Sequence, residues 1–354
     1  MSQEFVPVIH FDGHPLMPTV PFRARRWIKM GKATPFWSHG LFCVRLTIVP
    51  LDTKTQPIAT GIDPGSKKEG YTAKSTAHTY LNIQADAVTH VKKAVKTRHT
   101  LRHHRRYRKT PCRQNRKNRA RGSLPPSTKA RWQWKPRIAR WLTRIFPITV
   151  FVVEDVSAKT RPGQRRWNRS FSPLAIGKQW FYAALAELAP VIRQFGWDTK
   201  QQRDALGLKK TSRKMAEVFD AHTVDSWVMA HAVVGGSSLP DHTTLFCVAP
   251  IRLHHRALHR QNPLKGDHGR RRPYGGTRSQ GFKRGGLVRH PHWGVTYVGG
   301  TLDGRISLHR VSDGKRLTQR AQPADCRFLT YNAWHAHWAT PPQRKGGRRG
   351  SSSA

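Results

Sequence analysis

The sequence predicts a mixed α/β fold built around one sheet. Short apolar segments typical of strands alternate with longer segments whose apolar residues recur at helical spacing. Such alternation is typical of α/β domains. A second observation supports one shared sheet: in a very basic chain, acidic residues stand at the ends of two strand candidates and on one helix candidate. We expect a small unit before this domain and a small β-rich module after it.

Residues 1–56 predict the small N-terminal unit. The segment Gly13–Pro18 reads Gly-His-Pro-Leu-Met-Pro, and a basic stretch follows it around Trp27. Alternating apolar residues then predict a strand that ends near residue 49. The basic side chains of this unit that we expect to contact nucleic acid are Arg23, Arg25 and Arg26.

Residues 57–86 predict the beginning of the main sheet. Strands are expected at 58–63, 70–73 and 80–85, because these segments are short, apolar and separated by turn residues. Asp63 stands at the end of the first of them. Its carboxylate is therefore expected at one edge of the sheet.

Residues 87–123 predict a basic helix followed by a basic linker. Helical spacing of apolar residues extends over 87–109, and Pro111 ends the helix because the residue before a proline avoids the α region. No acidic residue occurs between Ala87 and Val153. The arginines of this region that we expect to bind phosphates are Arg98, Arg102, Arg105, Arg106, Arg108 and Arg113.

The sequence pattern of residues 124–235 predicts further strands and helices of the main sheet domain. Apolar periodicity and length distinguish helices from strands here, and tryptophans at helical spacing predict a buried helix face. The expected elements are a helix over 129–146, a strand over 149–154, a helix over 174–195, an edge strand over 197–201 and a helix over 215–233.

Residues 236–354 predict a β-rich module. Gly-containing turn signals separate short apolar segments in this part of the chain. A loop rich in Gly, Arg, Lys and Pro is expected over 262–287, and a disordered tail over 344–354.

The charge of the chain predicts a polyanionic partner. There are 64 Lys and Arg against 19 Asp and Glu, which gives a formal net charge of +45 and a pI near 11.6. A basic chain of this kind binds nucleic acid in a strongly salt-dependent way. No apolar run is long enough to cross a bilayer. Nucleic acid is therefore favoured over a membrane surface as the partner.

The cysteines and the start of the chain favour an intracellular protein. The four cysteines have no Cys-x-x-Cys spacing, so the sequence indicates neither a zinc knuckle nor a disulfide framework. The first residues lack the basic and apolar regions of a secretory signal. We expect the protein in the cytoplasm.

Four side chains predict a divalent-metal site: Asp63, Glu154, His222 and Asp225. Carboxylates on apolar elements are costly unless a cation or hydrogen bonds compensate them. Carboxylates from separate segments can hold two divalent ions about 3.5–4 Å apart for phosphodiester cleavage, and oxygen ligands select Mg²⁺ or Mn²⁺. His222 lies three residues before Asp225, so both share one helix face. This histidine could ligate a metal or deprotonate the attacking water.

Several assignments in this set stay open at the level of sequence. Glu154 and Asp155 are adjacent, so on a strand they face opposite sides, and either could be the ligand. Glu217 and Asp220 are alternative ligands near the histidine. Asp63 could also be an ordinary turn residue, because a Pro-Gly pair follows it.

The acidic motifs resemble those of a known nuclease family. Gly61–Ser66, Val152–Asp155 and Ala221–Ser226 are similar to the three split motifs of RuvC-type nucleases with an RNase H-like fold. The Pro-Leu-Met-Pro segment and the arginine-rich helix after the first motif resemble the IscB/IsrB family of transposon-encoded, RNA-guided nucleases. The resemblance covers roughly residues 10–235.

The resemblance implies an RNA-guided nickase. IscB carries a second nuclease domain, HNH, between its second and third RuvC motifs, and the interval from Glu154 to His222 is too short for one. This is the pattern of IsrB. It implies a structured guide RNA and a double-stranded DNA target with an adjacent motif, of which the RuvC domain cuts the displaced strand. The protein is then expected to be a monomer within a prokaryotic ribonucleoprotein.

The resemblance also implies roles for residues. Asp63, Glu154 and Asp225 would be ligands of two Mg²⁺ ions, for which Mn²⁺ could substitute, with His222 as ligand or general base. The arginine-rich helix would be a bridge helix that binds guide phosphates, since effectors of this kind hold the nucleic-acid backbone. The β-rich module 236–354 would contact the guide and the adjacent motif.

Two other functions fit part of this pattern. One is a stand-alone junction resolvase resembling RuvC itself, although the basic additions and the N-terminal unit argue against it. The other is a non-catalytic RNA-binding protein, although the intact acidic set argues against that.

Overall fold

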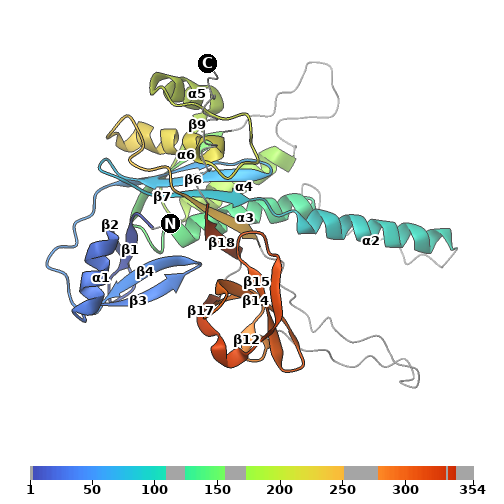
Figure 1. The fold of residues 1–354 in the computed structure, drawn as a ribbon. Coiled ribbons are helices and arrows are strands. Elements are labelled where there is room, and N and C mark those ends of the chain that lie inside the picture. Colours follow the sequence, from blue (N-terminus) through green and yellow to red (C-terminus); the bar gives the residue numbers. More distant parts are fainter. Residues whose placement is uncertain (1–2, 109–123, 156–172, 251–277, 332–333, 340–354) are drawn as a thin grey trace, which may run out of the picture.

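The computed structural model describes residues 3–108, 124–155, 173–250, 278–331 and 334–339. The fold is mixed α/β, as the sequence predicts, and has a central sheet of seven strands (Figure 1). In spatial order these strands are β18 (Trp334–Trp338), β10 (Leu245–Pro250), β7 (Thr79–Asp86), β6 (Lys68–Lys74), β5 (Ile58–Asp63), β8 (Ile148–Asp155) and β9 (Val191–Phe195).

Strand directions in this sheet follow from the connections. The hairpin-linked strands β5, β6 and β7 pair antiparallel, whereas β8 and β9 run parallel to β5. The five strands from β7 to β9 therefore have the order 3-2-1-4-5 with only the second reversed, which is the arrangement that an RNase H-like fold has. The expected strands at 58–63, 70–73, 80–85 and 149–154 are all confirmed, three of them as parts of longer strands.

One face of the sheet is covered by helix α6 (Phe219–Val234), which replaces the expected helix over 215–233. Glycines of the sheet allow this helix to approach very closely. A Cβ atom at Gly61 would overlap the backbone carbonyl oxygen of Ser226, and one at Gly70 would overlap that of His222. Backbone-to-backbone packing thus fixes the position of the helix that carries His222 and Asp225.

The opposite face packs against α3 (Pro126–Leu142) and α4 (Pro173–Ala186). Trp134 and Trp141 of α3 are buried there, so these tryptophans belong to the core as their helical spacing predicts. They pack with Phe246 and Trp334, which lie on strands β10 and β18. The range 236–354 thus contributes two strands to the central sheet.

Two expected elements are wrong. The helix over 174–195 ends at Ala186, and its last residues form strand β9 instead. Pro190 separates the two, because the residue before a proline avoids the α region. The expected edge strand over 197–201 is the first half of helix α5 (Gly196–Ala205). Asp198 begins this helix by accepting a hydrogen bond from the backbone N–H of Phe195, 3.1 Å away.

Two smaller sheets flank the central one. The N-terminal unit holds β1 (Val6–Ile9), β2 (Pro15–Thr19), β3 (Ala33–Ser38) and β4 (Leu41–Leu46) with helix α1 (Pro21–Lys29). The C-terminal part forms a five-stranded sheet from β13 (Gly286–His290), β14 (Gly294–Leu302), β15 (Arg305–Arg310), β16 (Arg316–Ala321) and β17 (Arg327–Tyr331), beside the short pair β11 (Arg278–Ser279) and β12 (Phe282–Lys283). The N-terminal sheet and the five-stranded C-terminal sheet each have an apolar cluster of their own.

The basic helix predicted over 87–109 is α2 (His90–Tyr107), which projects from the body of the molecule (Figure 1). Its side chains are mostly exposed, so most of them are available to a polyanionic partner and do not pack into a hydrophobic core. Among the helices that the structure describes, none is both long and apolar enough to cross a membrane. The expected basic loop and tail, 262–287 and 344–354, lie largely or wholly outside the described residues.

The close approach of α6 gives the first prediction. Gly61→Ala should lower the free energy of unfolding by about 1–3 kcal/mol, because the added methyl overlaps backbone that cannot move aside. Urea denaturation measures this change. Gly300→Ala is the matched control, since a Cβ there meets only the Ser307 hydroxyl at 4.0 Å. Equal stability of the two variants would contradict the packing.

Candidate active site

Two carboxylates meet at the carboxyl ends of adjacent parallel strands. Ile62 of β5 lies beside Val153 of β8, so the next residues, Asp63 and Glu154, are neighbours at the same sheet edge. The two side chains are close enough to share a hydrogen bond. Burial first, and then the charge of Asp63, raise the pKa of Glu154 to about 8. The pair therefore holds one proton readily and repels a second negative charge.

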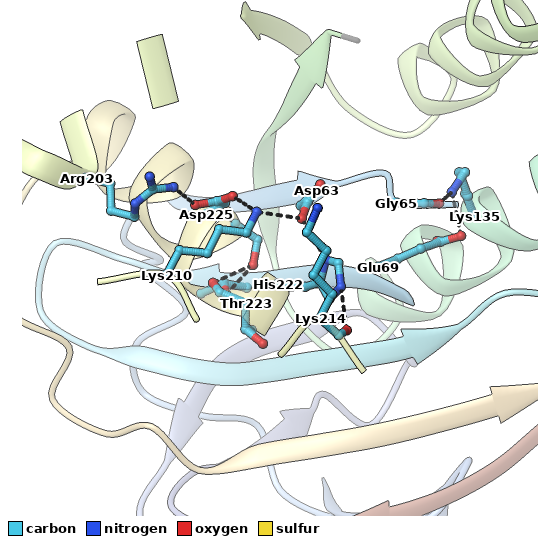
Figure 2. Close-up of polar contacts among 12 residues, drawn as sticks. Asp63, Gly65, Glu69, Lys135, Arg203, Lys210, Lys214, His222, Thr223 and Asp225 are labelled. Carbon is cyan, nitrogen blue, oxygen red and sulfur yellow. Dashed lines mark hydrogen bonds and ion pairs between the residues drawn. The ribbon is translucent and has the colours of Figure 1, made fainter. Parts of the chain in front are cut away.

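Helix α6 adds His222 and Asp225 from the face above the sheet. His222 Nδ1 lies 3.1 Å from Asp63 Oδ2, and its Nε2 lies 3.0 Å from the backbone oxygen of Lys214 (Figure 2). Both oxygens are acceptors, so both contacts are satisfied together only when both ring nitrogens carry hydrogen. To ligate a metal or accept a proton, this histidine must give up one of the two contacts.

Cations of the chain compensate the buried Asp225. Arg203 Nη1 of α5 donates to Asp225 Oδ1 at 2.5 Å, and Lys210 Nζ donates to Asp225 Oδ2. Lys210 Nζ also lies 3.9 Å from Asp63 Oδ2, so its ammonium stands between the two carboxylates (Figure 2). Burial would lower the pKa of Lys210, but the charges of Asp63 and Asp225 raise it above its usual value.

Asp63 is almost completely buried and still favours its ionised form. Burial alone would raise its pKa, but the hydrogen bond with His222 and the charge of Lys210 more than offset this, and the pKa is lowered. The site thus combines a lowered pKa at Asp63 with a raised pKa at Glu154, and the ammonium group of Lys210 lies between Asp63 and Asp225. A divalent cation could replace both the proton and the ammonium.

The site also depends on a buried ion pair that the sequence did not reveal. On the other face of the sheet, Glu69 is fully buried and accepts from Lys135 Nζ at 2.5 Å and from the Tyr71 hydroxyl at 2.7 Å. Lys135 also donates to the backbone oxygen of Gly65 at 3.2 Å. It therefore ties the loop after Asp63 to helix α3. The sequence signal that could have revealed this pair is Lys135 itself, a lysine on a helix face that tryptophans otherwise bury.

Strand alternation places the two adjacent acids in different surroundings. Glu154 faces Asp63, whereas Asp155 faces α4, where Lys178 and the Tyr182 hydroxyl donate to it. Burial opposes ionisation of Asp155, but these partners lower its pKa. Of the alternative ligands, Asp220 is exposed and Glu217 pairs with His337 at 3.1 Å.

Two compact groups of possible metal ligands occur within the described ranges. They are His10 with Asp12 and His14, and Glu217 with Cys247 and His337, each with donor atoms within 4.8 Å of one another. The Asp63 set is not among these groups. Its donors are nevertheless carboxylate oxygens from three segments, the ligand type that Mg²⁺ and Mn²⁺ prefer.

Most of the predicted nucleic-acid-binding arginines lie on helices α1 and α2. Those with exposed side chains are Arg23, Arg25 and Arg26 on α1, Arg98, Arg102 and Arg106 on α2, and Arg108 at the end of α2. Arg105 belongs to α2, but its side chain lies outside what the structure describes. Arg113 lies outside the described residues altogether.

Comparison with known proteins gives a match to one family model and likenesses to solved structures, two of which are described below. The family model described as RRXRR protein matches residues 6–166. The chain is similar to T. thermophilus RuvC in complex with Holliday junction substrate, at 16% identity over 51% of this chain and 97% of that chain, with a TM-score of 0.29. It is also similar to a Thermus thermophilus RuvC structure, at 16% identity over 49% and 93%, with a TM-score of 0.25. No curated protein matches the chain.

The matched family range includes the helices α1 and α2 with their arginines, as well as Asp63 and Glu154. It ends before α6. The arginine-rich segment Arg105-Arg106-Tyr107-Arg108 lies inside it.

The raised pKa of Glu154 predicts a pH dependence of stability in metal-free protein. Because the folded-state pKa of about 8 exceeds the ordinary value of 4.5, the folded protein binds more protons between these limits. The free energy of unfolding therefore falls as pH rises through this window. Glu154→Gln removes this contribution. The melting temperature of the variant, relative to that of the parent, should therefore rise between pH 5 and pH 9. Asp155→Asn, the adjacent control, should not show this gain; a parallel profile for Glu154→Gln would contradict the site.

The position of Lys210 predicts competition with a metal ion. Lys210→Met should increase Mn²⁺ affinity about tenfold, because it removes a positive charge from between Asp63 and Asp225. Isothermal titration calorimetry measures the affinity. Lys209→Met, the exposed neighbour, is the matched control and should bind Mn²⁺ like the parent. Unchanged or weaker affinity of Lys210→Met would contradict competition.

Proposed function

We propose that this protein is a divalent-metal-dependent, RNA-guided DNA endonuclease that nicks the displaced strand of its target. The observation that carries the proposal is the meeting of Asp63 and Glu154 at the carboxyl ends of parallel strands, below the helix with His222 and Asp225. The raised pKa of Glu154 marks a site where a cation would relieve repulsion. The RNase H-like strand order supports the same chemistry.

Each site residue has a defined part in the proposal. Asp63, Glu154 and Asp225 hold two Mg²⁺ ions, for which Mn²⁺ can substitute. When bound, such ions activate water and stabilise the leaving oxygen of a phosphodiester. His222 is either a further ligand or the base that takes the proton of the attacking water. Arg203 keeps Asp225 oriented through its 2.5 Å hydrogen bond.

A guide RNA explains the basic helices. The exposed arginines of α1 and α2 lie away from the carboxylates, so they serve binding rather than cleavage (Figure 1). A net charge of +45 far exceeds what a small active site requires. The family match over 6–166 and the resemblance to IscB/IsrB proteins support RNA as the partner of these helices. The C-terminal five-stranded sheet would contact the guide or the motif beside the target.

One carboxylate site of this kind among the described residues supports nicking rather than a double-strand cut. Between β8 and α6, the described residues 173–218 form α4, β9, α5 and a loop. These elements complete the sheet and the carboxylate site, and they leave no room for a second nuclease domain of the HNH kind. One strand is therefore cut.

The proposal predicts the loss of cleavage without loss of RNA. Asp63→Asn and Glu154→Gln should each reduce Mg²⁺-dependent nicking of a guide-matched plasmid at least about a hundredfold, since each removes a carboxylate ligand. The affinity for the co-purifying RNA should stay near that of the parent, because the arginine helices are unchanged. Gel analysis of relaxed and supercoiled plasmid measures nicking.

Asp220→Asn is the control for this experiment. Asp220 is exposed in the first turn of α6, five residues before Asp225 but outside the carboxylate group. Its variant should cut normally. Parent-like cutting by Asp63→Asn would sink the catalytic assignment, and cutting that needs no guide RNA would favour a stand-alone nuclease.

A further inference from the structure

Two large aromatic side chains are exposed at the start of helix α5. Phe195 is 47% exposed and Trp197 is 66% exposed. Their rings are nearly parallel, with an interplanar angle of 11° and centroids 6.4 Å apart. Parallel rings open to solvent present flat apolar faces that a third flat group can cover.

This aromatic pair lies directly beside the carboxylate site. Gly196, between the two aromatic residues, faces Glu154 so closely that a Cβ atom there would overlap Glu154 Oε1. In the sheet, Phe195 lies next to Asp155, and Gln194 next to Glu154. Only Gly196 separates the two aromatic residues in sequence. Both therefore stand next to the backbone position that contacts the Glu154 carboxylate.

The backbone that carries the pair is fixed. The N–H of Phe195 donates to Asp198 Oδ2 at 3.1 Å, and the buried Thr199 hydroxyl donates to the Phe195 carbonyl at 3.3 Å. The same helix also reaches the other side of the site, because Arg203 binds Asp225. Helix α5 therefore holds the aromatic pair at a constant position relative to two carboxylates.

The charge around the pair favours a nucleic acid. Arg193 and Lys200 are exposed on either side of it in sequence. Aromatic faces combined with basic side chains are the usual way in which proteins bind single-stranded nucleic acid, because each base offers a flat face and each phosphate a charge. An apolar protein partner would not need the basic residues.

We propose that Phe195 and Trp197 form a stacking subsite for a base of single-stranded DNA, next to the phosphate that is cut. This inference rests on the proposed nuclease function and extends it to how the strand is held. A base stacked here places the neighbouring backbone against Glu154. Because every base has a flat face, the subsite tolerates any sequence, as a guided nuclease requires.

The test uses the full-length protein in the Asp63→Asn background, which prevents cleavage. A single-stranded DNA oligonucleotide with 2-aminopurine in place of one base reports stacking through fluorescence quenching. Trp197→Ala and Phe195→Ala should each weaken binding about tenfold and reduce the quenching. Trp197→Phe should restore most of both, since it keeps an aromatic face. Both side chains are exposed, and thermal melting confirms that the variants fold.

Trp180→Ala is the matched control, because Trp180 is 41% exposed and lies on helix α4, which packs against the opposite face of the central sheet. It should leave the quenching unchanged. Parent-like DNA binding and quenching in both aromatic variants would overturn the subsite, as would a changed oligomeric state with DNA binding intact, which would identify a protein contact. Either result would leave the nuclease proposal standing if Asp63→Asn alone abolishes nicking, so the two failures are distinguishable.

Discussion

The compensation of buried negative charge is the constraint on which the rest of this structure depends. The sheet places Asp63 and Glu154 side by side, and α6 adds Asp225. Asp63 and Asp225 are buried, and Glu154 is half-buried. Uncompensated, such a group would be strongly destabilising. The protein supplies a proton on Glu154 and two cations, Lys210 and Arg203. Both cations contact Asp225 directly.

The geometry of the carboxylates is set by backbone packing rather than by the acids themselves. Glycines at positions 61 and 70 let α6 lie directly on the sheet, so His222 and Asp225 have little freedom to move. On the opposite face, Lys135 holds the loop after Asp63 by bonding Gly65 and Glu69. Both faces of the sheet thus contribute to one site, which explains why residues far apart in sequence are needed for it.

The positions of the acidic residues could be predicted from the sequence, but the cations that pair with them could not. Strand ends and helical spacing predicted where Asp63, Glu154 and Asp225 lie, because these features depend on local pattern. Lys210 and Arg203 escaped prediction, since basic residues are so frequent in this chain that two more carry no signal. The helix expected over 174–195 was wrong in its last part, because Pro190 ends the helical segment and Val191–Phe195 form the mostly exposed edge strand β9 instead.

The most direct test of the central claim is a crystal structure of the protein soaked with Mn²⁺, with the ions located by anomalous scattering. The account predicts anomalous peaks about 2.1 Å from oxygens of Asp63, Glu154 and Asp225, with the ammonium of Lys210 displaced from between them. An undisturbed Lys210 with no ion at these carboxylates would contradict it.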